Sequence, residues 1–199
     1  MAYQIPLAPA TAELDVKKSR FIARAYPVES RQQAMQYLTA LRAEFPDARH
    51  ICWAYVLGNQ SSAAMSDDGE PSGTAGKPIL NVLQHKVIGN VLVAVVRYFG
   101  GIKLGAGGLM RAYSGAAQAV VDALQLTPYV AMQWAEVTLA FSQEQVMRHW
   151  CQQHQVRIDD VAYGHQVMML LQLPQVAMEG LQDFCDVLGA TLRSQPEDY

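Results

Sequence analysis

Apolar and polar positions alternate along the first half of the chain in a way that predicts a mixed α/β domain. Residues 91–96 are consecutive apolar side chains, mostly β-branched, which predicts a central strand buried on both faces. Alternating positions predict further strands near 12–17, 20–27 and 49–57. Apolar positions at helical spacing predict helices near 30–45, 76–85 and 106–125.

The second half has the element order β-α-β-β-α-β, which is the ferredoxin-like plan. Its predicted elements, in chain order, are 133–141, 142–154, 155–162, 166–173, 174–189 and 190–194. Ser142, with Gln145 three positions later, has the spacing of a capping box at the start of the first helix. Pro128 cannot continue the helix before it, so we expect an α+β protein with domains at 1–130 and 131–199.

Charge divides the chain at the same place. Residues 1–132 carry twelve Lys/Arg and nine Asp/Glu, a net charge of +3, whereas residues 133–199 carry three and nine, a net charge of −6. This asymmetry indicates two units with different tasks, and it favours an anionic partner for the first unit only. It gives no support to non-specific nucleic-acid binding by the whole chain.

The composition favours a globular cytoplasmic protein. Hydrophobic residues make up 51% of the 199 positions, and no apolar run approaches the length of a membrane span. The first residues lack the basic and apolar regions of a secretory signal. Cys52, Cys151 and Cys185 fit neither a disulfide framework nor a zinc site, and their apolar surroundings predict buried thiols in a reducing compartment.

A glycine-rich turn after the predicted central strand is the first candidate for function. The strand ends in Arg97 and Tyr98, and Lys103 and Arg111 follow without an intervening acid. The glycines of the turn are Gly100, Gly101, Gly105, Gly107 and Gly108. Free N–H groups at a helix start together with three cations predict an anion site. The alternative is that the glycines only shape the turn and the cations are solvated.

An acidic loop at 66–78 is the second candidate. Asp67, Asp68 and Glu70 lie there among turn-forming residues, which is typical of either a mobile linker or a folded binding loop. We predict that loop and turn form one site, in which Asp67 or Glu70 pairs with Arg97 or Lys103. The candidate binding residues are Asp67, Asp68, Gly69, Glu70, Gly73, Lys77, Arg97, Tyr98, Gly100, Gly101, Lys103, Gly105 and Arg111.

The two segments SDDGEPSGTAGKPIL and VVRYFGGIKLGAGGLMRAY together resemble the signature of the IMPACT family. They cover residues 66–113. The resemblance implies a first domain similar to domain IV of elongation factor G and a second similar to its domain V. Eukaryotic relatives bind the ribosome-associated activator of an amino-acid-starvation kinase, so the resemblance implies a link to ribosomes or structured RNA.

Three functions remain open from the sequence. The favoured one is a non-enzymatic regulator that contacts the ribosome, RNA or a translation-associated protein. The second is direct nucleic-acid binding through Arg97, Lys103 and Arg111. The third is an enzyme acting on a small phosphorylated or anionic metabolite, with Asp67, Asp68 or Glu70 as acid/base or metal-binding groups. We expect no cofactor, no metal and no membrane contact, and the sequence gives no oligomeric state.

Overall fold

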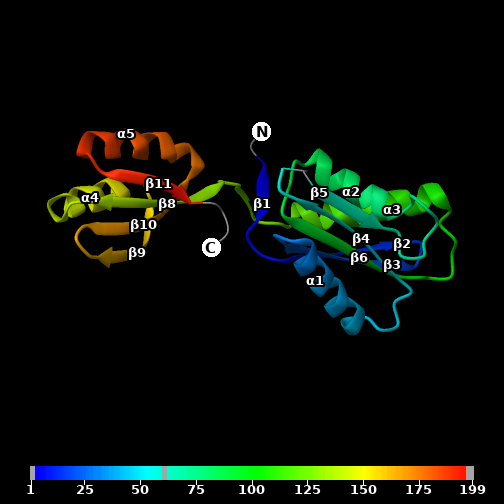
Figure 1. Ribbon diagram of the computed structural model, residues 1–199. Helices are drawn as coiled ribbons and strands as arrows, with labels where there is room; N and C mark the ends of the chain where they lie inside the picture. The colour runs from blue at the N-terminus through cyan, green and yellow to red at the C-terminus, as the bar shows by residue number, and fades with distance from the viewer. Residues whose placement is uncertain (1–2, 60–61, 196–199) are drawn as a thin grey trace. The chain divides into compact units, whose positions relative to one another are not determined.

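The computed structural model describes residues 3–59 and 62–195. It divides into two compact units, Met1–Tyr129 and Val130–Tyr199, called unit 1 and unit 2 below (Figure 1). Each unit has its own sheet and its own hydrophobic core. The chain is therefore of mixed α/β type with more than one sheet.

Unit 1 is built on a five-stranded antiparallel sheet in the order β2-β3-β6-β4-β5. Its strands are β2 (Ala10–Val16), β3 (Ser19–Pro27), β4 (His50–Leu57), β5 (Ser62–Ser66) and β6 (Val91–Tyr98). The short strands β1 (Gln4–Pro6) and β7 (Leu126–Pro128) pair with each other. Strand β6 is central and buried from Val91 to Arg97, so the predicted strand buried on both faces is confirmed.

Helices cover both faces of this sheet (Figure 1). Helix α1 (Arg31–Glu44) packs on one face, and α2 (Gly76–His85) with α3 (Ala106–Asp122) packs on the other. Alternation along β6 divides the core, because Val91, Val93 and Val95 face α2 and α3 while Ala94 and Val96 lie in the cluster on the α1 side.

Unit 2 has the element order β-α-β-β-α-β, with an antiparallel sheet in the order β11-β8-β10-β9. Its strands are β8 (Met132–Leu139), β9 (Arg157–Tyr163), β10 (Val167–Pro174) and β11 (Thr191–Gln195), and its helices are α4 (Glu144–Gln153) and α5 (Met178–Leu188). Helix α5 ends at Gly189, which has a left-handed φ of 67°. The core between helices and sheet is made of apolar side chains, Cys151 and Cys185.

The structure corrects several details of the sequence prediction. Ser142 does not cap α4. It lies in a 3-10 turn, and Gln143 Oε1 accepts the N–H of Ala140 at 2.9 Å. The last helix begins at Met178 instead of Pro174, which ends β10. Strands β1, β5 and β7 were not predicted, and Pro128 lies in β7 within unit 1.

The buried environment of the three cysteines was predicted correctly, since Cys52, Cys151 and Cys185 are all buried and free. Across the described ranges, 3–59 and 62–195, no helix is long and apolar enough to cross a bilayer.

Candidate functional site

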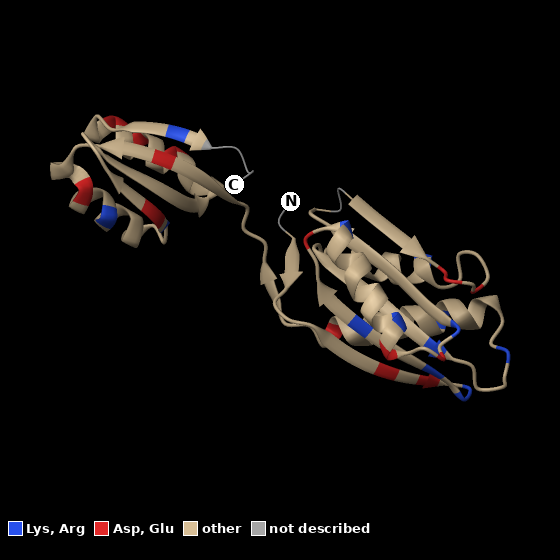
Figure 2. Cartoon of the chain, turned by 60° about the horizontal axis from the view of Figure 1, so that its bottom comes forward, with Lys and Arg blue, Asp and Glu red and all other residues tan. Residues whose placement is uncertain are grey.

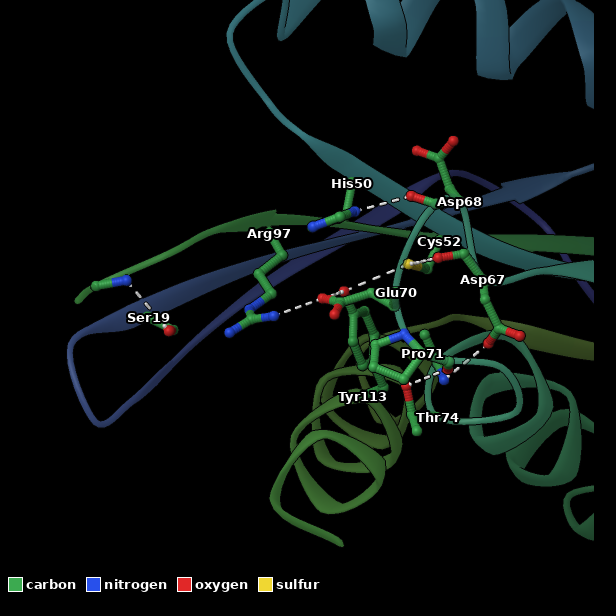
Figure 3. Close-up of polar contacts among 12 residues, drawn as sticks. Ser19, His50, Cys52, Asp67, Asp68, Glu70, Pro71, Thr74, Arg97 and Tyr113 are labelled. Carbon is green, nitrogen blue, oxygen red and sulfur yellow. Dashed lines mark hydrogen bonds and ion pairs between the residues drawn. The ribbon is translucent and has the colours of Figure 1, made fainter. Parts of the chain in front are cut away.

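Two motif-bearing segments meet at one end of the sheet of unit 1. Strand β6 ends there and β4 begins there, so Arg97 lies in register with His50 on one side and with Phe21 of β3 on the other. Arg97 shares the face of Val91, Val93 and Val95, which is the face covered by α2 and α3. The loop 67–75 lies at this end of the sheet (Figure 3), and the glycine turn 99–105 follows the end of β6 there.

A buried ion pair joins the loop to the strand. Arg97 Nη1 lies 2.6 Å from Glu70 Oε1, and the two side chains are only 7% and 4% exposed. Tyr113 of α3 donates its hydroxyl to the same Glu70 oxygen at 2.8 Å (Figure 3). The Arg97 guanidinium also lies 5.6 Å from the ring centre of Phe21 and 5.7 Å from that of Phe99. Arg97 is therefore not the surface cation that the sequence suggested.

The pairing of Glu70 with Arg97 is one of the pairs named from the sequence. In the described residues, Asp67 and Lys103 form no ion pair within 4.0 Å. The ion pair fixes the position of the loop relative to the central strand. Removing either partner leaves a buried charge uncompensated, which is strongly destabilising.

Tyr113 and Cys52 extend this buried network. Cys52 Sγ lies 3.3 Å from the Tyr113 hydroxyl and 2.9 Å from the carbonyl oxygen of Asp67. Burial raises the pKa of the Cys52 thiol to about 12. Burial also raises the pKa of Tyr113, as do the neighbouring Cys52 and Glu70. Both groups therefore stay protonated at neutral pH, and Cys52 is not poised as a thiolate nucleophile.

Asp67 folds the loop onto the start of α2. Its carboxylate accepts the N–H groups of Gly73 at 2.8 Å, Ala75 at 3.0 Å and Gly76 at 2.8 Å. Burial alone would raise the pKa of Asp67, but these three N–H donors outweigh burial and lower it. Thr74, which is buried, donates its hydroxyl to the Pro71 carbonyl at 2.6 Å. The loop is therefore a folded element and not a tether.

Asp68 holds the other side of the loop. Its Oδ2 accepts the N–H of Ile51 at 2.6 Å and pairs with Arg42 Nη2 at 2.6 Å. Its carbonyl oxygen lies 2.8 Å from His50 Nδ1. All three loop acids are therefore engaged in contacts that shape the loop. Within the described residues, no group of three or more His, Cys, Asp or Glu side chains is arranged to hold a metal ion.

Gly100 lets the turn approach the β2–β3 connection closely. Its N–H donates to Ser19 Oγ at 3.2 Å, and a Cβ there would lie 1.9 Å from the Lys18 carbonyl oxygen. Gly101 and Gly105 have φ values of 87° and 72°, which favour glycine. Gly100, Gly101 and Gly105 therefore shape the turn, as the alternative interpretation of the sequence expected of its glycines. The same interpretation expected solvated cations, which does not hold for Arg97, because its side chain is buried.

A cleft of about 770 Å³ opens between the loop and the turn. Its lining residues are Asp47, Arg49, His50, Glu70, Pro71, Arg97, Tyr98, Phe99, Lys103, Leu104, Gly105, Ala106 and Leu109. The N-terminus of α3 opens here, because Gly105 and Ala106 both line the cleft. Acidic and basic residues occur together at this end of unit 1 (Figure 2).

The predicted site residues fall into three groups. Glu70, Arg97, Tyr98, Lys103 and Gly105 line the cleft. The residues that shape the loop or the turn around it are Asp67, Asp68, Gly69, Gly73, Gly100 and Gly101. The other two are exposed and do not line the cleft: Lys77 on α2 and Arg111 on α3.

Sequence reasoning missed the residues that complete the site from other elements. His50, Cys52 and Tyr113 face the loop, and Arg49 and Phe99 line the cleft. The alternation of β4 placed His50 and Cys52 on one face, and Tyr113 follows Leu109 by four residues on one face of α3. No signal in the sequence, however, indicated that these faces meet the acidic loop.

Comparison with known proteins agrees with this architecture. The family model described as the Impact N-terminal domain matches residues 17–121, which is more than half of the chain. An IMPACT family member of Haemophilus influenzae is 34% identical over 180 residues, covering 89% of this chain and 87% of that protein. The chain belongs to the IMPACT family. The segment matched by the IMPACT model contains every residue that lines the cleft.

A further curated relative and a solved structure extend the comparison. The IMPACT family member YigZ of Escherichia coli is 46% identical over 117 residues, covering 57% of each protein. A solved structure titled as that of a hypothetical protein is 32% identical, with a TM-score of 0.73, and the match covers 99% of this chain and 98% of that one. This likeness includes both units.

Proposed function

We propose that the chain is a non-enzymatic regulatory protein associated with translation. Unit 1 binds its partner, which is the ribosome, structured RNA or a translation-associated protein, through the loop 67–75 and the glycine turn. The link to translation rests on the resemblance to the IMPACT family. The observation that carries the proposal is the buried pair of Glu70 and Arg97, which joins the two family motifs in one site.

The charge around the cleft supports a specific partner over a bulk phosphate backbone. Glu70 compensates Arg97, so this arginine is not available to neutralise a series of phosphates. At the rim, Phe99 is 57% exposed and Ile102 is 42% exposed, next to Lys103. Exposed aromatic and aliphatic side chains beside a cation are typical of surfaces that bind other macromolecules specifically.

The roles of the loop acids support a binding protein more than an enzyme. Asp67 and Asp68 are engaged by backbone N–H groups and Arg42, and Glu70 is engaged by Arg97 and Tyr113. The second candidate is an enzyme acting on a small phosphorylated or anionic metabolite. The cleft favours it, because its volume lies in the usual range for small-molecule sites. Of the three acids, only Glu70 lines that cleft.

We also propose that the two units are separate domains, at 1–130 and 131–199, related to domains IV and V of elongation factor G. The division into two compact units supports the boundary, and the β11-β8-β10-β9 order of unit 2 supports the second likeness. The free, buried cysteines support a cytoplasmic location.

Sedimentation of the full chain in cell extract tests the proposed function. The wild-type chain is expected in the ribosomal fractions at low salt. The variant Ile102→Ser/Lys103→Glu, which alters two exposed residues of the turn, is expected in the unbound fraction. The control is Lys86→Glu/Val87→Ser, which introduces the same two residue types at exposed positions that do not line the cleft. It also replaces the ion pair of Lys86 with Asp122 by two acids, so thermal unfolding checks that the control variant is folded.

The control is expected to sediment like the wild-type chain. Two results would contradict the proposal. One is a wild-type chain that is absent from the ribosomal fractions at low salt. The other is a turn variant that sediments as the wild-type chain does.

A further inference from the structure

We propose that the outer edge of β5 binds an extended, uncharged peptide segment of a partner protein, which adds to the sheet of unit 1 as a further strand. No residue of this strand, or of the groove beside it, lines the cleft, so the inference goes beyond the proposed function. Three observations carry it: an unpaired strand edge, the lack of any feature that protects this edge, and an apolar groove next to it.

The first observation is that β5 pairs on one side only. It is the last strand in the order β2-β3-β6-β4-β5, and its partner is β4 (Figure 1). Among the described residues, no backbone-to-backbone hydrogen bond joins β5 to any other element. Ser62, Ala63 and Met65 are exposed, so the outer side of the strand is open to solvent. A row of unpaired N–H and C=O groups at a sheet edge can pair with another strand.

The second observation is that β5 lacks the features by which sheet edges avoid such pairing. Natural edges carry charged side chains, prolines or bulges. Among the described strands, the other three edges of the two larger sheets have them. Strand β2 carries Glu13 and Asp15, β11 carries Arg193, and β9 carries charged residues and has an irregular register with β10. Strand β5, with the sequence SAAMS, has no charge and no proline, and its register with β4 is regular.

The third observation is a groove of about 570 Å³ between α1 and β4, which includes Met35 of α1 and Trp53 of β4 in its lining. Trp53 lies in register with Ser66 of β5, and its ring stacks on that of Tyr55 with 5.8 Å between the ring centres. Met35 and Ala64 of β5 pack against the same buried cluster, so the groove and the strand share one face of the sheet. A strand added to β5 lies about 10 Å from β4, which is twice the usual strand spacing, so a large side chain on it meets Trp53 across β5.

Charge decides which kind of segment fits. Strand β5 has no charged residue, and within the described residues the one charged side chain that lines the groove, Arg42, is paired with Asp68. A charged segment would lose solvation at this surface without gaining a partner, so the segment is uncharged. Its backbone provides the hydrogen bonds, and its apolar side chains at every second position provide the contacts with the groove.

A second copy of the chain fits this edge less well. On the side of the groove, β5 presents Ser62, Ala64 and Ser66. In an antiparallel pair of two β5 strands, these small side chains would face one another and leave the groove unfilled. The pair would also join only five residues of each chain, whereas stable interfaces bury about 1,200 Å² or more. A segment of another protein with large apolar side chains is therefore the better occupant.

The test is the selection of peptides from a random phage-displayed library on the full chain, followed by NMR with the best synthetic peptide. The selected peptides are expected to be uncharged, with apolar residues at alternate positions. In the full, ¹⁵N-labelled chain, the peptide is expected to shift the amide signals of residues 62–66 saturably. It is also expected to slow the hydrogen exchange of every second amide in β5, because these N–H groups gain acceptors.

Two N-methylated forms of the selected peptide separate strand pairing from other modes of binding. In a strand pair, only every second residue of the peptide donates its N–H to the sheet. One form is methylated at the odd positions and the other at the even positions. One of the two is expected to lose affinity by about tenfold or more, and the other is expected to bind as the parent peptide does.

Two alanines of α1 give a matched pair of protein variants. Ala43 and Ala40 are both exposed, and only Ala43 lines the groove. Ala43→Glu places a carboxylate in the groove, which the bound segment would desolvate, so the affinity for the peptide is expected to fall about tenfold. Ala40→Glu is expected to keep the affinity. Thermal unfolding checks that both variants fold.

The inference is overturned if no selected peptide gives saturable shifts in β5, or if the two N-methylated forms bind equally. Equal affinities of Ala43→Glu and Ala40→Glu for the peptide would overturn it as well. A dimer of the chain that forms with rising concentration, with its amide shifts in β5, would also overturn it, because a second copy would then be the occupant.

Discussion

The two units of this chain both pack helices against an antiparallel sheet, yet their interiors differ. Over residues 3–59 and 62–195, the buried polar or charged residues are Ser19, Thr74 and Arg97, and all three lie in unit 1. The core of unit 2 holds apolar side chains and two cysteines whose pKa values burial raises to about 11.

The buried polar residues of unit 1 share one task. Ser19 accepts the N–H of Gly100, Thr74 donates to Pro71, and Arg97 pairs with Glu70. Each contact holds either the acidic loop or the glycine turn in place. Burying a polar group opposes folding unless the group is hydrogen-bonded or paired. The concentration of buried polar residues at one end of unit 1 therefore indicates a structured site, whereas the core of unit 2 serves packing alone.

The largest expected effect is on the buried ion pair. Glu70→Gln leaves the Arg97 charge uncompensated and is expected to destabilise unit 1 by about 3 kcal/mol. In unit 2, Glu144 pairs with the exposed Arg148, so Glu144→Gln is expected to change stability little. Urea unfolding measures the effect on unit 1 through Trp53 fluorescence, in a chain with Trp134 and Trp150 replaced by Phe. The effect on unit 2 is measured through Trp134 and Trp150 fluorescence, in a chain with Trp53 replaced by Phe.

Comparable effects of the two glutamate substitutions, each measured on its own unit, would remove the distinction drawn between the units. A large loss of stability in unit 2 on Glu144→Gln would also remove this distinction, because the exposed ion pair would then matter as much as the buried one.

The second expected effect compares a glycine from each unit. Gly100→Ala forces a Cβ against the Lys18 carbonyl and is expected to cost about 2 to 3 kcal/mol. Gly189→Ala has open space around its Cβ and a φ of 67°, so only backbone strain of about 1 kcal/mol is expected. Urea unfolding of each unit measures both costs, and equal costs would contradict the close approach at Gly100.

The third effect depends on pH. Asp67→Asn replaces an acceptor oxygen of the loop by a donor and is expected to cost about 1 to 2 kcal/mol at neutral pH. The pKa of Asp67 is lower in the folded state than its ordinary value of 3.8. The carboxylate therefore contributes stability above that value and loses it as the pH falls through its folded pKa.

The difference in unfolding free energy between the wild type and Asp67→Asn is expected to shrink between about pH 5 and pH 2. Urea unfolding across this range measures it. A difference that stays constant or grows towards low pH would show that Asp67 does not act through its charge.

The last prediction, with the smallest expected effect on stability, concerns the chain segment that connects the two units. Limited proteolysis is expected to cut after β7, near 129–132, and to leave two folded fragments. A fragment 1–129 is expected to keep the native fold of unit 1, whereas 1–125 loses the β1–β7 pair. Resistance to cleavage in this segment, with no independent fold of 1–129, would contradict the proposal of separable domains.

Much of the architecture could be predicted from local pattern. The apolar run at 91–96 gave the central strand, Ser30 and Gly189 marked helix ends, and the element order of unit 2 followed from its periodicity. These features are determined by neighbouring residues in the sequence. Strand β5 (SAAMS) was missed because its small and polar residues lack a β signal, and it forms by pairing with β4.

The candidate site was predicted in its residues but not in its electrostatics. The sequence indicated both segments and the pairing of Glu70 with Arg97. It did not indicate that Arg97 is buried, because that depends on Tyr113 and Phe21 reaching the same place from α3 and β3. Contacts between residues far apart in sequence leave no local pattern. In this chain such contacts bury the side chain of Arg97.

The central claim is that loop and turn form one site through the ion pair of Glu70 and Arg97. A double-mutant cycle with Glu70→Gln and Arg97→Met, scored on the stability of unit 1 and on sedimentation with ribosomes, tests it most directly. The account predicts that the two substitutions are strongly non-additive, with a coupling of about 2 kcal/mol in stability and the same loss of ribosome association in either single variant as in the double variant. Additive effects in both measurements would show that the loop and the turn are two independent surface features.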